Sequence, residues 1–238
     1  MVSVCMATYN GERFLKEQLD SIISELSPED ELVISDDGSS DNTLRIIEDF
    51  GDSRIKLFHN RTSHGVNNNF ENALRNASGD FIFFADQDDI WIQGKVNKCV
   101  KHLLDSDCVI HDCFVTDSNL EIKDKSLFAN INSGKGFIKN ILHNSYSGSC
   151  MCIRRDLIPK ILPFPKNTHF FYDQWIGLRT ELKGNTMFIN DKLIKFRRHD
   201  SSTSSAAGKS GLSFRERISY RISLIAHLFM FDLKKIFQ

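Results

Sequence analysis

The sequence lacks the cysteine pairs that would indicate a disulfide framework or a structural zinc site. Its six cysteines fall at irregular spacings along 238 residues, and none belongs to a Cys-x-x-Cys pair. Paired cysteines at regular spacings are typical of both kinds of site. We therefore expect reduced thiols in a protein of the cytoplasm.

A signal sequence and a long apolar run are also missing. The chain opens with MVSVCMATYN, which is typical of a strand and not of a basic and then apolar signal. A spanning helix needs about 18 consecutive apolar residues, and no run reaches that length. We expect a protein that is soluble or bound only peripherally to a membrane.

Net charge is nearly absent, because 30 basic residues face 31 acidic ones and leave a formal charge of -1. Proteins that bind nucleic acid usually carry a strong basic excess, so no nucleic-acid partner is expected. With 41% hydrophobic and 26% charged residues, the chain suits one large globular domain, or one domain with an appendage.

Strand-like and helix-like segments alternate along the first 85 residues. Runs rich in β-branched and aromatic residues predict strands, and apolar residues three and four positions apart predict helices. This alternation indicates an α/β fold with a parallel, doubly wound sheet that binds ligands at the carboxyl ends of its strands. The predicted strands cover residues 2–9, 32–35, 54–60 and 80–85, and the predicted helices cover 10–26, 43–50 and 67–78.

Polar loops follow three of these strands, and the most acidic lies in FIFFADQDDIW, residues 81–91. Asp86, Asp88 and Asp89 repel one another, and burying each carboxylate is costly unless a cation meets it. Turns and helix caps are the alternative for each loop, with Asp89 capping the next helix. Three polar loops at one edge of a sheet nevertheless predict a ligand crevice.

Two kinds of nucleotide site fit such a crevice. A dinucleotide-binding fold would place Asp36 and Asp37 on a ribose, but it needs a Gly-x-Gly-x-x-Gly turn, where the sequence offers only Gly11. In a nucleotide-sugar fold, two carboxylates of an Asp-x-Asp segment hold a divalent cation that carries the diphosphate charge. Mg²⁺ or Mn²⁺ at Asp86 and Asp88 would then be the cationic partner of the cluster.

Five segments together resemble the family 2 glycosyltransferases of the GT-A fold, close to bacterial rhamnosyltransferase-like enzymes of O-antigen (lipopolysaccharide) or capsule polysaccharide synthesis. The segments are MATYNGERFLKEQLDSI, ISDDGSSDNT, NFENALRNASGDFIFFADQDDIW, FYDQW and RRHDSS, in that order. The resemblance implies a Rossmann-like nucleotide-diphospho-sugar transferase with a mixed sheet flanked by helices over residues 1–205. Residues 206–238 would add a flexible loop and a C-terminal helical appendage.

The resemblance also implies an activity. A sugar would move, with inversion, from a UDP- or dTDP-sugar to an acceptor hydroxyl, with Mg²⁺ or Mn²⁺ as cofactor. It implies Asp173 as the catalytic base, metal ligands at Asp86, Asp88 and His199, and donor contacts from Thr8, Tyr9, Glu12, Asp37, Asn69, Asp86, Gln87 and Arg198. A non-catalytic nucleotide-binding or scaffold protein that kept the fold is the alternative.

The surroundings of Asp173 also suit a base. It lies among aromatic residues in THFFYDQWIG, and an apolar setting raises a carboxylate pKa toward the range useful for proton transfer. The alternative is an aspartate that caps a helix starting near Gln174. By the same resemblance, Ser147, Gly148 and Ser149 are expected to border the acceptor.

The last 25 residues, FRERISYRISLIAHLFMFDLKKIFQ, predict an amphipathic helix after a flexible SSTSSAAGKSG loop over the donor. Five basic residues against two acidic ones make this segment positive. An apolar face bordered by basic residues suits the anionic inner face of the cell membrane, where a lipid-linked glycan acceptor would lie. Packing on the catalytic domain or on a second subunit, as a homodimer, is the alternative. The predicted apolar stripe is Ile218, Ile222, Ile225, Phe229, Leu233 and Ile236, widened by Leu224, Leu228 and Phe231.

Overall fold

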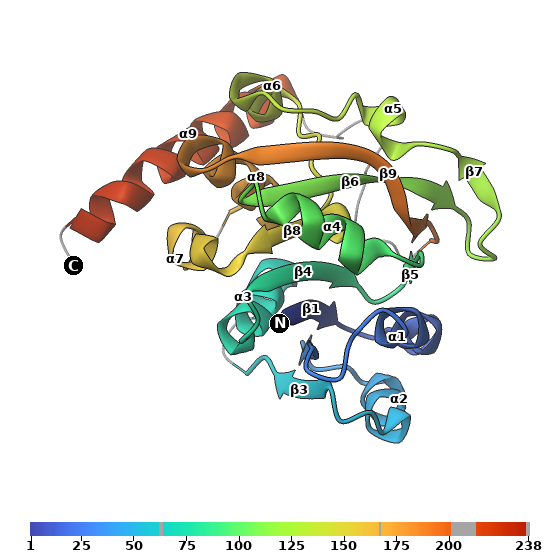
Figure 1. Cartoon of the computed structure of the whole chain (residues 1–238). Coiled ribbons are helices and arrows are strands. Elements are labelled where there is room, and N and C mark those ends of the chain that lie inside the picture. Colours follow the sequence, from blue (N-terminus) through green and yellow to red (C-terminus); the bar gives the residue numbers. More distant parts are fainter. Residues whose placement is uncertain (62–63, 167, 201–212, 237–238) are drawn as a thin grey trace.

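The computed structural model describes residues 1–61, 64–166, 168–200 and 213–236, and in this part of the chain one sheet of nine strands runs through the molecule (Figure 1). The order is β3-β2-β1-β4-β8-β6-β9-β5, with β7 paired to β6. The strands are β1 (Val2–Thr8), β2 (Glu31–Asp36), β3 (Ile55–His59), β4 (Phe81–Asp86), β5 (Ile90–Trp91), β6 (Cys108–Thr116), β7 (Ile122–Asp124), β8 (Met151–Arg154) and β9 (Thr186–Arg197).

Helices flank this sheet, and the longest lies at the C-terminus. They are α1 (Leu15–Ile23), α2 (Thr43–Phe50), α3 (Val66–Asn76), α4 (Lys95–Leu103), α5 (Leu127–Ile131), α6 (Phe137–Leu142), α7 (Ile158–Ile161), α8 (Tyr172–Lys183) and α9 (Phe214–Ile236), with 3-10 turns η1 (Gly148–Cys150) and η2 (Arg155–Leu157).

The first four strands form the parallel half that the sequence predicts. β1 pairs in parallel with β2 and β4, and β2 pairs in parallel with β3. β1 and β2 are buried along almost their whole length, as expected for parallel strands covered on both faces. Leu15, Leu19 and Ile22 of α1 join the same core. The predicted strand boundaries in this half lie within one residue of the observed ones, whereas the predicted helix 10–26 begins five residues before α1 and ends three residues after it.

The second half of the sheet is mixed, so the prediction of a parallel, doubly wound sheet was wrong beyond β4. β8 runs antiparallel to both β4 and β6, β9 runs parallel to β6, and β5 runs antiparallel to β9. The local patterns that indicated a parallel sheet end at residue 85, before these strands begin. The mixed sheet flanked by helices that the family resemblance implies is confirmed.

The inner side of α9 packs on the rest of the molecule. Leu224 and Leu228 are buried, and the ring of Phe231 lies 5.3 Å from that of Trp175 in α8. Asp232 pairs with the buried Arg179 of α8 at 2.7 Å. Figure 1 shows α9 running past α8 and α6 along the edge of the molecule. Packing on the rest of the chain therefore accounts for this side of the helix.

The outer side of α9 carries the predicted apolar stripe. Ile222, Phe229 and Leu233 are 62%, 70% and 55% exposed, and Ile218 and Ile225 lie beside them. The widening residues Leu224, Leu228 and Phe231 were misplaced, because they belong to the inner side. None of the helices in the described ranges is long and apolar enough to cross a membrane. The SSTSSAAGKSG loop and the side chains of Lys234, Lys235 and Ile236 lie outside the described residues.

Candidate active site

The carboxyl ends of β1, β2 and β4 open into a pocket of about 680 Å³. Residues from all three polar loops line it, together with residues of α3, α8 and the segment after β9. The crevice that the polar loops predict is therefore present, at the sheet edge where α/β proteins bind ligands. The predicted site residues that line it are Thr8, Tyr9, Asp37, Asn69, Asp86, Gln87, Asp88, Ser147, Gly148, Asp173 and His199.

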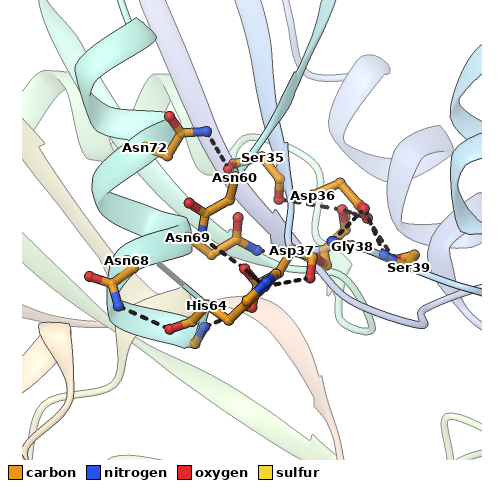
Figure 2. A network of polar contacts seen from close by, with 12 residues as sticks. Ser35, Asp36, Asp37, Gly38, Ser39, Asn60, His64, Asn68, Asn69 and Asn72 are labelled. Carbon is orange, nitrogen blue, oxygen red and sulfur yellow. Dashed lines mark hydrogen bonds and ion pairs between the residues drawn. The ribbon is translucent and has the colours of Figure 1, made fainter. Parts of the chain in front are cut away.

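Asp37 is the centre of a polar network at one end of this pocket (Figure 2). Asn60 Nδ2 donates to its Oδ1 at 2.8 Å, and the main-chain N–H of Gly65 donates to its Oδ2 at 2.7 Å. Nδ1 of His64 lies 3.1 Å from Oδ1. These contacts hold the carboxylate in one orientation, and Oδ2 keeps acceptor capacity for a ligand.

The neighbouring Asp36 shapes the turn instead of lining the pocket. It is fully buried, and its carboxylate accepts hydrogen bonds from Thr8 Oγ1 at 2.9 Å and from the main-chain N–H groups of Gly38 and Ser39 at 3.0 and 2.8 Å. Such local bonds fix the conformation of a turn. The dinucleotide interpretation requires both Asp36 and Asp37 to reach a ribose, but only Asp37 lines the pocket.

Asn69 presents a hydrogen-bond acceptor to the same end of the pocket. Its Nδ2 donates to the carbonyl oxygen of Thr8 at 3.0 Å, which fixes the amide plane. Its Oδ1 is buried and has no partner among the described residues. Buried acceptors without a partner are uncommon in proteins, so this atom is suited to receive a donor group of a ligand.

The loop after β1 is held by Gln87 of the Asp-x-Asp segment. Gln87 Oε1 accepts from the main-chain N–H of Tyr9 at 2.9 Å, and its Nε2 donates to the Tyr9 carbonyl at 3.0 Å. A Cβ atom at Gly11 would lie 2.3 Å from Gln87 Oε1, so this glycine permits the clamp. Glu12 is directed away, to the main-chain and side-chain nitrogens of Asn42 at 2.9 and 2.7 Å.

The three aspartates after β4 take different positions. Burial raises the pKa of Asp86 to about 7, and the charges of Asp88 and Asp173 add to the rise. Asp88 Oδ2 lies 2.7 Å from Nε2 of His199. Asp89 is fully buried and accepts from the main-chain N–H of Arg197 at 2.9 Å. The prediction that Asp89 caps a helix was wrong, because strand β5 follows it and its carboxylate ties β9 to this loop.

Arg197 belongs to the basic segment RRHDSS, whose guanidinium groups the sequence suggests for binding diphosphate oxygens, but its contact with the acidic loop was not apparent from sequence. Its buried guanidinium donates to the carbonyl oxygens of Asp88 and Ser118, each at 2.8 Å, and pairs with Glu17. It brings positive charge and fixed geometry to the acidic loop from 109 residues away in sequence. The sequence signal that could have indicated this contact is a basic residue at the end of an apolar strand. The predicted donor contact, Arg198, is half-buried, and its main-chain N–H donates to Thr116 at 2.9 Å.

The Asp88–His199 pair provides the chemistry of a divalent cation site. A carboxylate and a neutral imidazole suit Mn²⁺, and a carboxylate suits Mg²⁺. No three His, Cys, Asp or Glu side chains of the described residues form a metal site by themselves. Mg²⁺ commonly binds through one or two carboxylates and takes its remaining ligands from water and substrate phosphates, so the residues present fit such a cation.

Asp173 lies in the first turn of α8 and faces the same pocket. Burial raises its pKa to about 6, although the main-chain N–H groups of Gln174 and Gly148 oppose the rise. The N–H of Gln174 donates to Asp173 Oδ1 at 2.7 Å. Ser147 and Gly148, expected at the acceptor, also line the pocket, whereas Ser149 is buried. A carboxylate with this pKa is poised to take up a proton near neutral pH.

Comparisons with known proteins agree with this geometry. Residues 3–162 match the family described as "Glycosyl transferase family 2". The chain is 30% identical over 210 residues to "UDP-Glc:alpha-D-GlcNAc-diphosphoundecaprenol beta-1,3-glucosyltransferase WfgD" of Escherichia coli, covering 86% of this chain and 80% of that protein.

Two solved structures share the fold. Staphylococcus aureus TarS in complex with UDP-GlcNAc superimposes with a TM-score of 0.71 at 23% identity, over 94% of this chain and 66% of that one. Glucosyl-3-phosphoglycerate synthase of Mycobacterium tuberculosis, in complex with Mn²⁺, UDP and glucosyl-3-phosphoglycerate, gives a TM-score of 0.61 at 19% identity, over 97% and 79%. The sheet is therefore that of the GT-A fold, and the chain belongs to glycosyltransferase family 2.

Proposed function

We propose that this chain transfers a sugar, with inversion, from a nucleotide diphosphate sugar to a hydroxyl of a lipid-linked glycan in the synthesis of a bacterial cell-surface polysaccharide such as O-antigen or capsule. The observation that carries the proposal is a single pocket shared by the Asp37 network, the Asp88–His199 pair and Asp173. These three groups suit a nucleobase, a diphosphate with its cation, and a reacting hydroxyl.

At the nucleobase end, Asp37 and Asn69 Oδ1 are acceptors held in place by main-chain and amide groups. Uracil and thymine carry an N–H between two carbonyl groups, and a fixed acceptor pairs with that N–H. These acceptors suit a UDP- or dTDP-sugar as the donor. E. coli WfgD, whose name specifies UDP-Glc, supports the choice of UDP.

At the diphosphate end, Asp88 and His199 would hold Mg²⁺ or Mn²⁺, with Asp86 beside them. When bound, the cation neutralises the charge that develops on the departing diphosphate. Arg197 holds the main chain of this loop by donating to the carbonyl oxygen of Asp88.

At the reacting end, Asp173 accepts the proton of the acceptor hydroxyl as that oxygen bonds to the anomeric carbon. The bond from this carbon to the diphosphate oxygen breaks on the opposite face, which inverts the configuration and releases a nucleoside diphosphate. Its pKa of about 6 leaves Asp173 ionised at neutral pH and still basic enough to take the proton.

The outer side of α9 suits peripheral contact with an anionic membrane, where lipid-linked acceptors reside. Its exposed stripe of five large apolar residues has no cover within the described chain, and three arginines lie in its first turns. Two such helices pairing in parallel through this side would bring their arginine-bearing N-terminal ends together. Charge therefore favours an anionic lipid surface over a homodimer through α9.

The proposed activity is tested by release of nucleoside diphosphate from a panel of UDP-, dTDP- and GDP-sugars with Mn²⁺, with and without a polyprenyl-diphosphate sugar as acceptor. Release that requires metal, and rises with the lipid-linked acceptor, supports the proposal. Tight nucleotide binding without release from any donor would indicate the scaffold alternative.

The membrane contact is tested by sedimentation with vesicles of anionic phosphatidylglycerol or neutral phosphatidylcholine. An Ile222→Ser/Phe229→Ser variant should lose binding to anionic vesicles, whereas Ile122→Ser, at an isoleucine on β7 that is 50% exposed, should keep it. Equal sedimentation of all three proteins would exclude α9 as the contact, and dimerisation of the wild type without vesicle binding would favour the homodimer.

A further inference from the structure

The inner side of α9 reaches the helix that carries Asp173. Tyr220, in the second turn of α9, donates a hydrogen bond from its hydroxyl to Oε1 of Gln174. Gln174 immediately follows Asp173 in α8 and is 1% exposed. A residue at the C-terminal end of the chain, outside the segment that matches the family, therefore contacts the neighbour of the proposed base.

Gln174 joins three helices through its side-chain amide. While its Oε1 accepts from Tyr220 of α9, its Nε2 donates to the carbonyl oxygen of Asn140 in α6 at 2.9 Å. Both polar ends of a buried amide are therefore satisfied. The amide fixes where the first turn of α8 lies between α6 and α9.

The position of that turn determines where the carboxylate of Asp173 points. In the part of the chain that the structure describes, the groups that hold this carboxylate are main-chain N–H groups, among them those of Gln174 and Gly148, and not side chains that could adjust independently. A small displacement of the α8 backbone therefore moves the carboxylate directly. Proton transfer is sensitive to such shifts because it needs heavy-atom distances of about 2.6–3.2 Å.

Contacts on either side keep Tyr220 in place. The ring of Tyr220 lies edge-on to the ring of Phe170, with 6.4 Å between their centres. The next residue, Arg221, donates to the carbonyl oxygen of Leu142 in α6 at 2.6 Å. Burial, together with the nearby charge of Asp173, raises the pKa of Tyr220 to about 12, so the hydroxyl remains a donor at physiological pH.

We infer that Tyr220 is a positioning residue for sugar transfer, acting through Gln174 to hold Asp173 in its reactive orientation, so that α9 is part of the catalytic unit. The inference rests on the proposed function, because it takes Asp173 as the base. It does not depend on the outer side of α9 or on membrane binding.

The test compares Tyr220→Phe with the wild type in steady-state kinetics, using the panel donor that releases nucleoside diphosphate fastest. Loss of the hydroxyl leaves Gln174 Oε1 buried without a partner, so the amide moves while the ring packing stays. We expect kcat to fall about tenfold, the donor KM to stay within twofold, and the melting temperature to change by no more than a few degrees.

Asp232→Asn is the matched control, because it weakens the other anchor of α9, the ion pair with Arg179, without touching Gln174. It should lower the melting temperature and leave kcat unchanged. Gln174→Leu should lower kcat as Tyr220→Phe does, and the double variant should be no slower than the slower single one, since both act through one hydrogen bond.

Unchanged kcat in Tyr220→Phe would overturn the inference. An equal fall of kcat in Asp232→Asn would also overturn it, because general loosening of α9 would then be responsible. Effects of Tyr220→Phe and Gln174→Leu that multiply fully in the double variant would overturn it too, because the two residues would then act independently. Absence of turnover in the wild type with every donor would instead contradict the proposed function itself.

Discussion

Replacing Asp173 with asparagine separates catalysis from stability. The change keeps the shape of the side chain and an acceptor oxygen for the main-chain N–H of Gln174, but it removes the charge and the basicity. If Asp173 is the base, kcat should fall at least about 100-fold, the low end of general-base catalysis, while donor affinity changes little. If Asp173 only caps a helix, the same change should lower the free energy of unfolding and leave kcat largely unchanged.

The predicted effect on stability follows from the direction of the pKa shift. Burial raises the pKa of Asp173 from 3.8 to about 6, so the folded protein binds this proton more tightly than the unfolded chain does. A raised carboxyl pKa means that folding loses stability as pH rises from about 4 to 6, and that the full cost persists above pH 6. Two pKa units correspond to about 3 kcal/mol at most.

Because the side chain of Asp173 is only half-buried, solvent screening makes the actual cost smaller than this. Asp173→Asn removes this cost, but it also removes a negative charge at a helix N-terminus, which lowers the stability of the variant by about 0.3–1 kcal/mol. The variant also gains stability because the charge of Asp173 no longer repels Asp86. We therefore expect Asp173→Asn to raise the free energy of unfolding by about 1–2 kcal/mol at pH 8, or the melting temperature by about 2–8 °C. At pH 4 the difference should nearly vanish.

Urea denaturation of the apo protein between pH 4 and 8, together with single-turnover kinetics, tests both halves of this prediction. Asp173→Glu is the companion variant, because it keeps the charge and displaces it by one methylene. A variant Asp173→Asn that is less stable than the wild type at pH 8, or that retains more than a fifth of its kcat, would refute the assignment of Asp173 as a strained base.

Three other perturbations test the remaining parts of the pocket. Asp88→Ala should abolish Mn²⁺-dependent UDP binding in calorimetry and leave the apo protein folded, because relief of the repulsion among neighbouring carboxylates offsets the lost contact with His199. Normal metal-dependent binding would argue against a cation at this residue. Asp37→Asn replaces one of the two acceptor oxygens by an amide N–H₂, which then faces either Asn60 or Gly65, both of them donors, so it should lower the free energy of unfolding by about 1–3 kcal/mol and weaken UDP binding, as measured by urea denaturation and calorimetry. Gly11→Ala should displace Gln87 from the Tyr9 main chain and weaken UDP binding about fivefold; unchanged affinity would show that the clamp does not order the donor loop.

The parts of the fold that follow local pattern were predictable from sequence. The first four strands and three helices have the apolar spacings of their elements, and α2 occupies residues 43–50 as predicted. The mixed half of the sheet was not predictable from such patterns, because β8 and β9 acquire their neighbours from strands far away in sequence. The mixed sheet was predicted from the family resemblance and not from the spacing of apolar residues.

The candidate site divides in the same way. Strand ends located Asp37, Asp86 and Asp88, because parallel strands deliver their carboxyl ends to one edge. The pairing of Asp88 with His199, 111 residues later, depends on the path of β9 and has no local signal.

Sequence patterns were also ambiguous for α9. Its apolar residues cover nearly the whole circumference, so periodicity alone did not reveal which ones the domain would bury. Contacts from α6 and α8 decide which side faces inward.

A crystal structure of the wild-type chain with UDP and Mn²⁺ tests the central claim most directly. The account predicts the cation bound between Asp88 and the diphosphate, with His199 beside it, and the uracil N–H paired with Asp37. UDP bound elsewhere on the molecule, or bound in this pocket with its diphosphate away from Asp88 and no cation, would contradict the account.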